Sequence, residues 1–296
     1  MTGIILLDKP NNMTSFSAVN RVRRLLSVKK AGHTGTLDPM ATGVLPIALS
    51  NCTRFIDFLP VHDKAYVAEA RLGVTTDTLD STGTVLSESE VNVTREALES
   101  VIKNYIGTIK QIPPMYSAIS KDGKRLYELA RQGIEIEREA REITIYSLSL
   151  ISFEKDRFTL SIECSAGTYI RSLIDDIGRD LGCGAVMTAL RRTAANGFSI
   201  EDCVTLEELE KAVSENRQDE YITPVEKSFD IYPDITVTEG QAKRFSNGGE
   251  LSRDRLRENP ADGIYRVYSP EGFFLGLGET EPKSEFLKVK RVFVRE

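Results

Sequence analysis

The segment GHTGTLDPMATGVLP, residues 32–46, decides how this chain is organised. Three glycines and two prolines interrupt it, so neither a regular helix nor a regular strand can run through it. Glycines also let the backbone approach a ligand closely, and the residue before Pro39 is pushed towards an extended conformation. The segment carries one histidine, His33, and one carboxylate, Asp38. We predict a ligand-binding loop centred on Asp38; an ordinary turn capped by that aspartate is the alternative.

Upstream of this loop the sequence predicts a strand and a helix. Ile4–Leu7 is a short apolar run typical of a strand, and Asp8-Lys9-Pro10 ends it. Ser15 is predicted to cap the helix that follows. The expected apolar face of that helix comprises Phe16, Val19, Val22, Leu25 and Leu26, with Arg21, Arg23 and Arg24 turned outward.

Downstream of the loop, alternation and capping residues predict further elements. Lys64–Gly73 alternates like a strand, with Tyr66, Ala68 and Ala70 on one side. A helix capped by Thr94 follows, and Gly107 ends it. The stretch from Gln111 to Arg141 then interleaves basic residues with tyrosines, a composition suited to phosphate contact and base stacking.

A second candidate site residue lies at the start of a later helix. The segments 142–150 and 157–164 are predicted to form a strand pair, and Thr168 is predicted to cap the helix after them. Arg171 lies just inside the N-terminus of that helix, where the helix dipole disfavours a cation. We therefore expect an anionic partner for Arg171; a surface arginine bound to Asp175 is the alternative.

The C-terminal part of the chain changes in character. Thr205-Leu206-Glu207-Glu208 is a capping box that opens an acidic helix. A domain boundary is expected near Glu226–Asp230, before Pro233. Beyond it, short strands are predicted around residues 263–268, 273–277 and 287–294. The last strand region carries the basic residues Lys283, Lys288, Lys290, Arg291 and Arg295.

The distribution of charge is compatible with a polyanionic partner despite a net charge of −6. Residues 201–230 hold ten acidic and three basic side chains, whereas residues 1–60 hold seven basic and three acidic ones. A polyanion could therefore bind the face that contains the loop while the acidic segment points away. Ordinary solvent-exposed surface explains this distribution of acidic and basic residues equally well.

The cysteine and histidine content argues against a metal site. The four cysteines form no CxxC pair, and the chain has two histidines, His33 and His62. We therefore expect reduced thiols and no metal site. No apolar run approaches the length of a membrane span and no signal peptide is recognised, so a cytoplasmic protein is expected. No nucleotide-binding glycine motif and no Ser-His-Asp arrangement is recognised, and no cofactor is expected.

The loop sequence resembles the active-site signature of the TruB family of tRNA pseudouridine synthases, which has the form GHTG-x-LDP-x-A-x-G-x-LP. Three further stretches are similar to motifs of that family: Lys64–Gly73 with Thr76–Asp80, Ser165–Asp176, and Leu190-Arg191-Arg192. Lys9-Pro10 also resembles the family's first motif. The resemblance covers roughly residues 3–215 and extends more loosely to the C-terminus.

This resemblance implies an α+β fold. A mixed β-sheet with flanking helices would form a catalytic domain over residues 1–229, including an insertion at about 108–141 that grips the T arm. Residues 230–296 would form a small PUA-like β-barrel that contacts the acceptor end of tRNA. The resemblance implies a monomer that binds tRNA and needs no membrane and no obligatory protein partner.

The resemblance also implies a reaction, the conversion of the T-loop uridine at tRNA position 55 to pseudouridine with base flipping. Asp38 would be the catalytic residue, paired with Arg171. Substrate contacts would come from Tyr66, which stacks on the base, from Tyr169 and Leu190, which line the pocket, and from His33 and Lys9. The sequence leaves open whether Asp38 attacks the uracil ring or the sugar.

Two other classes of function remain as alternatives. A tRNA-binding chaperone without catalysis would use the same basic surfaces and would not need Asp38. An aspartate-based N-glycoside hydrolase would share the nucleophile but would release free uracil. Analysis of the products formed from tRNA separates all three.

Overall fold

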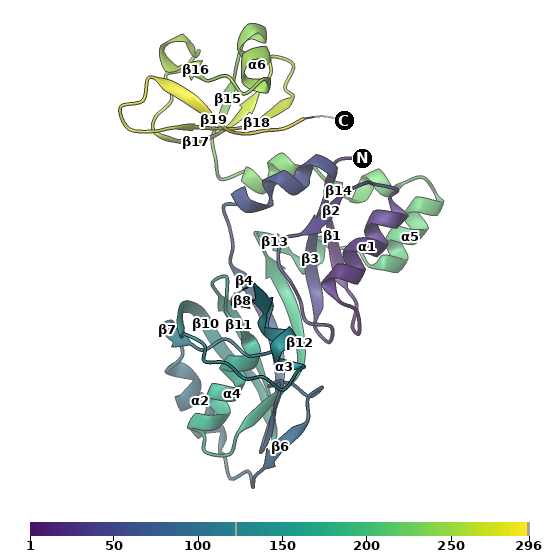
Figure 1. Ribbon diagram of the computed structural model, residues 1–296, viewed down its shortest axis with the longest axis vertical. Helices are drawn as coiled ribbons and strands as arrows, with labels where there is room; N and C mark the ends of the chain where they lie inside the picture. Colours follow the sequence, from purple (N-terminus) through teal and green to yellow (C-terminus); the bar gives the residue numbers. More distant parts are fainter. Residues whose placement is uncertain (122, 295–296) are drawn as a thin grey trace. The chain divides into compact units, whose positions relative to one another are not determined.

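A computed structural model describes residues 1–121 and 123–294 (Figure 1). The chain forms two compact units. Unit 1 comprises Met1–Pro39, Val44–Val61 and Asn196–Glu296, and unit 2 comprises Met40–Gly43 and His62–Ala195. In the described part of the chain, no helix is long and apolar enough to cross a membrane.

The N-terminal strand is the centre of the first sheet in unit 1. Strand β1 (Gly3–Lys9) lies between β14 (Ile222–Thr223) and β3 (Thr42–Leu49), and β2 (Ala31–His33) pairs with the far edge of β3. Ile5 and Leu7 pack into one apolar cluster, whereas Ile4 and Leu6 pack into another. An uninterrupted apolar run is what a strand covered on both faces requires.

Two helices cover one side of this sheet, α1 (Ser15–Leu25) and α5 (Leu206–Ser214). The predicted cap of α1 is wrong by one residue, whereas its predicted apolar face is right for Val19, Val22 and Leu26, which are buried, and wrong for Phe16. Thr14 is the N-cap, because its Oγ1 accepts the Ser17 N–H at 3.0 Å, and Ser15 is the first helical residue. Ser15, Ala18 and Val22 face inward, so Phe16, about 100° further round, projects outward and is 73% exposed.

The C-terminal residues of unit 1 form a five-stranded sheet with α6 (Glu239–Ser246) against it. Its strands, in spatial order, are β15 (Asp234–Thr236), β17 (Gly263–Tyr268), β18 (Phe274–Thr280), β19 (Phe286–Val292) and β16 (Leu251–Ser252). The sheet does not stand apart from the rest of unit 1. Phe274 and Phe293 pack with Phe55 of the 3-10 helix η1 (Ser50–Phe58), with ring centroids about 6 Å apart.

Unit 2 is built on a mixed sheet. In spatial order its strands are β12 (Ala185–Ala195), β4 (Lys64–Leu72), β11 (Arg157–Cys164), β10 (Arg141–Glu154) and β7 (Gly107–Gln111), and neighbouring strands are antiparallel. Thr42 and Gly43 add a parallel pairing to β12. Helices α2 (Arg95–Lys103) and α4 (Ile170–Asp180) lie side by side against this sheet (Figure 1).

The connections between these elements carry short pieces of structure. In unit 2 these are β5 (Val74–Thr76), β6 (Val85–Glu88), β8 (Ser120–Lys121), β9 (Lys124–Arg125) and α3 (Leu126–Ala130). In unit 1 they are β13 (Phe198–Ser199), η2 (Ile200–Asp202), η3 (Gln218–Tyr221), η4 (Val225–Phe229) and η5 (Arg253–Arg255).

Candidate active site

The loop that carries Asp38 is fastened on both sides of that residue. The Leu37 N–H donates to Ser15 Oγ at 2.8 Å, and the same hydroxyl donates to the Leu37 carbonyl at 3.1 Å. On the other side, the Pro39 carbonyl accepts the Met13 N–H at 3.2 Å. Asp38 itself is partly buried. A carboxylate whose two neighbours are tied to the scaffold is held in place before any ligand arrives.

Lys9 also holds the loop that carries Asp38, through hydrogen bonds from its side chain. Its side chain is fully buried, and Nζ donates to the carbonyls of Pro10 at 2.8 Å, Met13 at 2.6 Å and Pro39 at 3.3 Å. An ammonium has three donors, and these three carbonyls can use all of them. These three hydrogen bonds of Lys9 hold the loop, and a direct contact of Lys9 with substrate stays a prediction.

The other end of the loop is tied down next to His33. His33 closes β2 and pairs with Ile47 of β3. The following residue, Thr34, donates its N–H to the Pro46 carbonyl at 3.2 Å and its hydroxyl to Asn196 Oδ1 at 2.6 Å. The backbone on both sides of the signature segment is thus joined to regular structure, and His33 lies at the point where the loop leaves β2.

Arg171 is buried in unit 2 and has the anionic partner that its position required. Asp80 Oδ2 lies 3.9 Å from its Nη1, and both side chains are more than nine-tenths buried. The alternative of a surface arginine bound to Asp175 is wrong, because Asp175 instead pairs with the exposed Arg179 at 2.6 Å.

Both ends of the Arg171 guanidinium are also held by backbone carbonyls. Nη1 donates to Thr78 O at 3.1 Å, and Nη2 donates to Tyr116 O at 2.8 Å. A planar fork can serve acceptors on two sides at once, whereas an ammonium acts as a point charge. The side chain is therefore fixed in orientation as well as in position.

Asp80 is a site residue that the sequence reasoning left without a role. Its Oδ1 accepts hydrogen bonds from Thr78 Oγ1 and from the Thr82 N–H, both at 2.9 Å. A buried carboxylate needs such donors and a nearby cation to remain charged. The run TTDTLDST, residues 75–82, places hydroxyl donors around two aspartates, and that local density is the signal that could have singled out Asp80.

Tyr169 is the N-cap of α4, and the prediction that Thr168 caps this helix is wrong. The Thr168 hydroxyl instead donates to the Ser165 carbonyl at 3.0 Å. The buried side chain of Gln111 holds the backbone of Tyr169 through two hydrogen bonds. The Tyr169 N–H donates to Gln111 Oε1 at 2.8 Å, and Gln111 Nε2 donates to Tyr169 O at 3.0 Å.

Two further contacts join the segment after Gln111 to the first turn of α4. Ser172 Oγ donates to the Ile112 carbonyl at 3.0 Å, and Arg171 donates to the Tyr116 carbonyl as described. Residues 111–116 are thus fastened to the start of α4 at three positions, 169, 171 and 172. The predicted T-arm insertion, at about 108–141, includes this segment, so it is physically continuous with the residues that hold Tyr169 and Arg171.

Tyr66 and Leu190 lie on one face of the unit 2 sheet. Tyr66 of β4 is opposite Arg192 of β12, and Ala68 is opposite Leu190. Directly opposed residues of antiparallel strands point to the same face, so Tyr66 and Leu190 share that face, and both are buried. The structure thereby brings together two of the predicted pocket walls.

Arg192 gives this face a fully buried cation. It also lies near Lys64, whose pKa is lowered chiefly by burial and further by the charge of Arg192. Gly43 runs beside the Arg192 backbone with φ +102°, and a Cβ at that position would lie 2.1 Å from the Arg192 carbonyl oxygen. The third glycine of the signature segment is therefore required by a close approach of two backbones.

The predicted site residues fall into two groups. Lys9, His33 and Asp38 belong to unit 1, whereas Tyr66, Tyr169, Arg171 and Leu190 belong to unit 2. A pair between Asp38 and Arg171 would join the two units and stays a prediction. Within residues 1–121 and 123–294, no group of three or more His, Cys, Asp or Glu side chains could hold a metal ion.

The basic cluster predicted near the C-terminus is partly neutralised within its own sheet. Lys288 pairs with Glu281 and Lys290 pairs with Glu279, both at 2.7 Å. The Arg291 guanidinium lies 4.8 Å from the centre of the Phe58 ring. Lys283 is exposed, and Arg295 lies outside the described residues.

Comparison with protein families covers nearly the whole chain. A profile described as TruB family pseudouridylate synthase, N-terminal domain, matches residues 23–170. Profiles for the tRNA pseudouridylate synthase B C-terminal domain and for the C-terminal part of pseudouridine synthase II TruB match residues 171–230 and 233–293.

Comparison with individual proteins identifies relatives named tRNA pseudouridine synthase B. The chain is 47% identical to tRNA pseudouridine synthase B of Azoarcus sp. strain BH72, over 98% of this chain and 94% of that protein. It is 43% identical to the protein of the same name from Clostridium perfringens strain 13, over the full length of both.

Solved structures confirm the predicted fold class. A protein in the crystal structure of a Cbf5-Nop10-Gar1 complex superposes with a TM-score of 0.76 at 27% identity, covering 99% of this chain and 85% of that chain. The α+β pseudouridine-synthase fold and the PUA-like C-terminal sheet are as expected. By its sequence and by its fold, this chain belongs to the TruB family of pseudouridylate synthases.

Proposed function

We propose that this chain converts the T-loop uridine at position 55 of tRNA to pseudouridine, with Asp38 as the catalytic nucleophile. The observation that carries the proposal is the fixed position of Asp38 between two fastened neighbours, Leu37 and Pro39, in a loop with the family's signature. The tRNA specificity rests on the name shared by the related proteins, tRNA pseudouridine synthase B.

The reaction requires one correctly positioned carboxylate. Uracil is detached from the ribose and rejoined through a carbon atom, so there is no net redox change and no group to carry away. Free aspartate titrates near 3.9, and an opposite charge nearby favours the ionised form. In the proposed site Arg171, itself held by two carbonyls and Asp80, supplies that charge.

The target base has to leave the T loop to reach the carboxylate. Enzymes that react at a base extrude it into a pocket lined with aromatic and apolar groups. Tyr66 and Leu190, which share a sheet face, and Tyr169, which is gripped by Gln111, are the proposed walls. His33 is the proposed wedge that fills the vacated stack, and the predicted C-terminal domain would contact the acceptor end.

Replacement of Asp38 by asparagine tests the proposal. Asp38→Asn should abolish pseudouridine formation and change tRNA affinity by only a few-fold, because phosphate contacts dominate affinity. Nucleoside analysis of tRNA after single-turnover reactions gives the product, and filter binding gives the affinity.

The same measurements separate the alternatives. If the Asp38→Asn variant still formed pseudouridine at about a tenth of the native rate, Asp38 would not be the nucleophile. Release of free uracil by the native protein would identify an N-glycoside hydrolase. Tight tRNA binding with no change in the nucleosides would identify a non-catalytic chaperone.

A further inference from the structure

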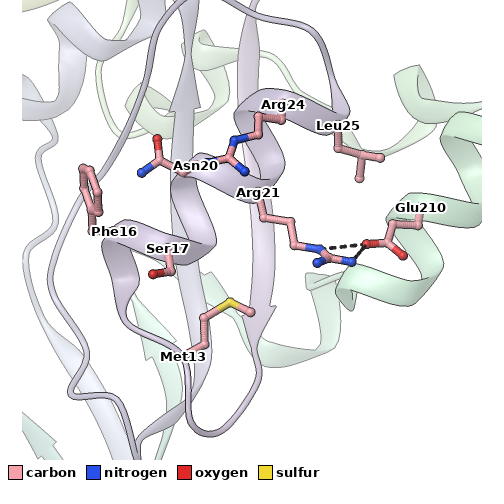
Figure 2. Close-up of a pocket in the computed structure, with 8 residues that line it drawn as sticks. All are labelled: Met13, Phe16, Ser17, Asn20, Arg21, Arg24, Leu25 and Glu210. Atoms are coloured by element: carbon pink, nitrogen blue, oxygen red, sulfur yellow. Dashed lines mark hydrogen bonds and ion pairs between the residues drawn. The ribbon is translucent and has the colours of Figure 1, made fainter.

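The most exposed of the large apolar side chains in the described residues is Phe16, on the outer face of α1. Figure 2 shows it projecting from the helix on the side away from Leu25 and from the Arg21–Glu210 ion pair. A single exposed aromatic is ordinary on a protein surface. Its surroundings make this one different, because hollows of about 720 and 480 Å³ lie on its two sides.

The smaller hollow, which we call the α1 groove, is strongly basic. Phe16, Asn20, Arg23, Lys29, Lys30 and His33 line it, together with three small or apolar residues. The lining therefore holds three full positive charges and no carboxylate. Within residues 1–121 and 123–294, none of Arg23, Lys29 and Lys30 takes part in an ion pair, and the buried Arg23 Nε has no hydrogen-bond partner.

The hollow on the other side of Phe16 differs in charge. There Arg21 is bonded to Glu210, which also lines that hollow. That hollow therefore has a carboxylate that neutralises one of its two arginines, Arg21 and Arg24, whereas the lining of the α1 groove has none. The buried Arg23 Nε is the donor of the three cations that is costly to leave without a partner, and Lys29 and Lys30 are exposed. An anionic occupant would satisfy Arg23 and pair with the two lysines.

Both ends of the α1 groove are joined to the catalytic loop. His33, which begins the signature segment, is part of its lining. At the other end, Phe16 follows Ser15, whose hydroxyl bonds both the N–H and the carbonyl of Leu37, the neighbour of Asp38. An occupant of the groove would therefore lie next to whatever is bound at Asp38.

We propose that the α1 groove binds the RNA strand beside the target uridine, with a base stacked on Phe16 and phosphates contacted by Arg23, Lys29 and Lys30. The proposal deepens the proposed function and rests on it. A flat aromatic ring next to unpaired cations suits a chain that alternates flat bases with phosphates. An acidic peptide would use the cations but would leave the exposed ring without a role.

Substitutions at Phe16 test the stacking part of the proposal. Phe16→Ala should raise the Kd for a T-arm RNA stem-loop by about 5-fold or more, because stacking on an aromatic ring contributes at least that much per base. Phe16→Leu keeps an apolar side chain but loses the flat ring, and should behave like the alanine variant. Phe16→Tyr should restore native affinity. Unchanged affinity in Phe16→Ala, or full rescue by leucine, would overturn the stacking contact.

The double variant Lys29→Gln/Lys30→Gln tests the phosphate contacts. Loss of two contacts should flatten the slope of log K against log salt by about 1.4 to 2. The matched control is Lys103→Gln/Lys155→Gln, which removes the same charge from exposed positions in unit 2 and should leave the slope nearly native. Equal changes in both double variants would mean that only net charge matters, and would overturn the proposal.

Two readouts keep this proposal distinct from the proposed function. If the native protein forms no pseudouridine, the proposed function fails whatever the variants do. If the native protein forms it and the α1 variants bind RNA normally, the α1 groove alone is refuted. Poly-L-glutamate serves as the competing ligand: variants that lose affinity for it but not for RNA would identify an acidic protein as the occupant and overturn the proposal.

Discussion

At the scale of single residues, the most informative side chain is Arg171, because its guanidinium serves two carbonyls that lie far apart in the sequence. We expect Arg171→Lys to lower the single-turnover rate by at least about 10-fold, since a point charge cannot orient its partners as a planar fork does. The rate of pseudouridine formation at saturating enzyme measures this.

A second arginine of the same helix, Arg179, supplies the control for that experiment. Arg179 lies two turns further along α4 with its side chain 69% exposed and paired with Asp175. Arg179→Lys should leave the rate within about 2-fold of native, because exposed ion pairs contribute little. An Arg171→Lys variant as active as the native protein would show that the fork geometry is not required.

Residues of this kind also mark what the sequence could and could not predict. Asp38 and Arg171 are recognisable because they lie inside motifs. Gln111 and Asp80 were missed as site residues because their partners, Tyr169 and Arg171, are distant in sequence and meet them only after folding. The errors at the start of α1 have local causes: Thr14 and Ser15 are both good caps, and Phe16, three residues before Val19, fits the apolar period of the helix although it is exposed.

At the scale of elements, α4 is held at its start by residues 111–116, near the beginning of the predicted insertion. Gln111→Met should slow catalysis by about 10-fold or more, because small misplacements of pocket residues are costly. RNA affinity should change only a few-fold, since Gln111 is buried and is not a phosphate contact.

A parallel set of measurements identifies what Gln111 does. Gln111→Glu keeps an acceptor for the Tyr169 N–H but loses the donor to the Tyr169 carbonyl, so its rate should fall between those of native and Gln111→Met. Gln218→Met, which changes a glutamine in η3 of unit 1, should be native in rate. A Gln111→Met variant that weakens RNA binding without slowing saturated turnover would contradict a positioning role.

The contact between the start of β3 and β12 gives a prediction about stability. Gly43→Ala and Gly107→Ala both place a Cβ at nearly the same left-handed φ, +102° and +103°. At Gly107 no described atom lies within 4 Å of that Cβ, whereas at Gly43 the Arg192 carbonyl oxygen lies 2.1 Å away. Gly107→Ala should cost about 1–2 kcal/mol for the backbone alone.

Gly43→Ala should cost a further 1–3 kcal/mol or so, the usual penalty for overpacking. Urea denaturation of the two variants side by side gives the difference directly. Equal free energies of unfolding would mean that the two backbones separate easily at this point, and that the glycine is needed for φ alone.

Strand boundaries show how element-scale prediction depends on context. The strand at 263–268 is found where the alternation placed it. For the basic cluster at residues 283–295, the sequence shows the charge but not the cross-strand neighbours, and its contact with RNA stays a prediction. Glu279 and Glu281 on and after β18 reach Lys290 and Lys288 only through the register of the sheet.

At the scale of the whole molecule, we predict that truncation after Phe229 lowers tRNA affinity more than saturated turnover, because Asp38, Tyr66, Tyr169, Arg171 and Leu190 all lie upstream of the cut. A T-arm stem-loop without an acceptor end should be nearly indifferent to the cut. The structure adds an expected loss of thermal stability, since Phe274 and Phe293 would no longer cover Phe55.

Rates and affinities for full tRNA and for the stem-loop, with intact and cut protein, test this prediction. A full-length Phe274→Ala variant separates the two effects, because it disturbs the aromatic cluster but keeps every C-terminal charge. Equal losses on both RNA substrates would show that residues 230–296 support the catalytic fold, and the division at residue 229 would then be wrong.

The pairing of β1 with β14 has a consequence for how the protein is made. Ile5 pairs with Ile222, so the first strand leaves the ribosome roughly 10 to 45 s before its neighbour, at synthesis rates of about 5–20 residues per second. Residues 62–195, by contrast, form the bulk of unit 2 without interruption. Unit 2 can therefore mature first, while an apolar N-terminal strand waits with one edge unpaired, and that interval is when the nascent chain is most exposed to chaperones and to aggregation.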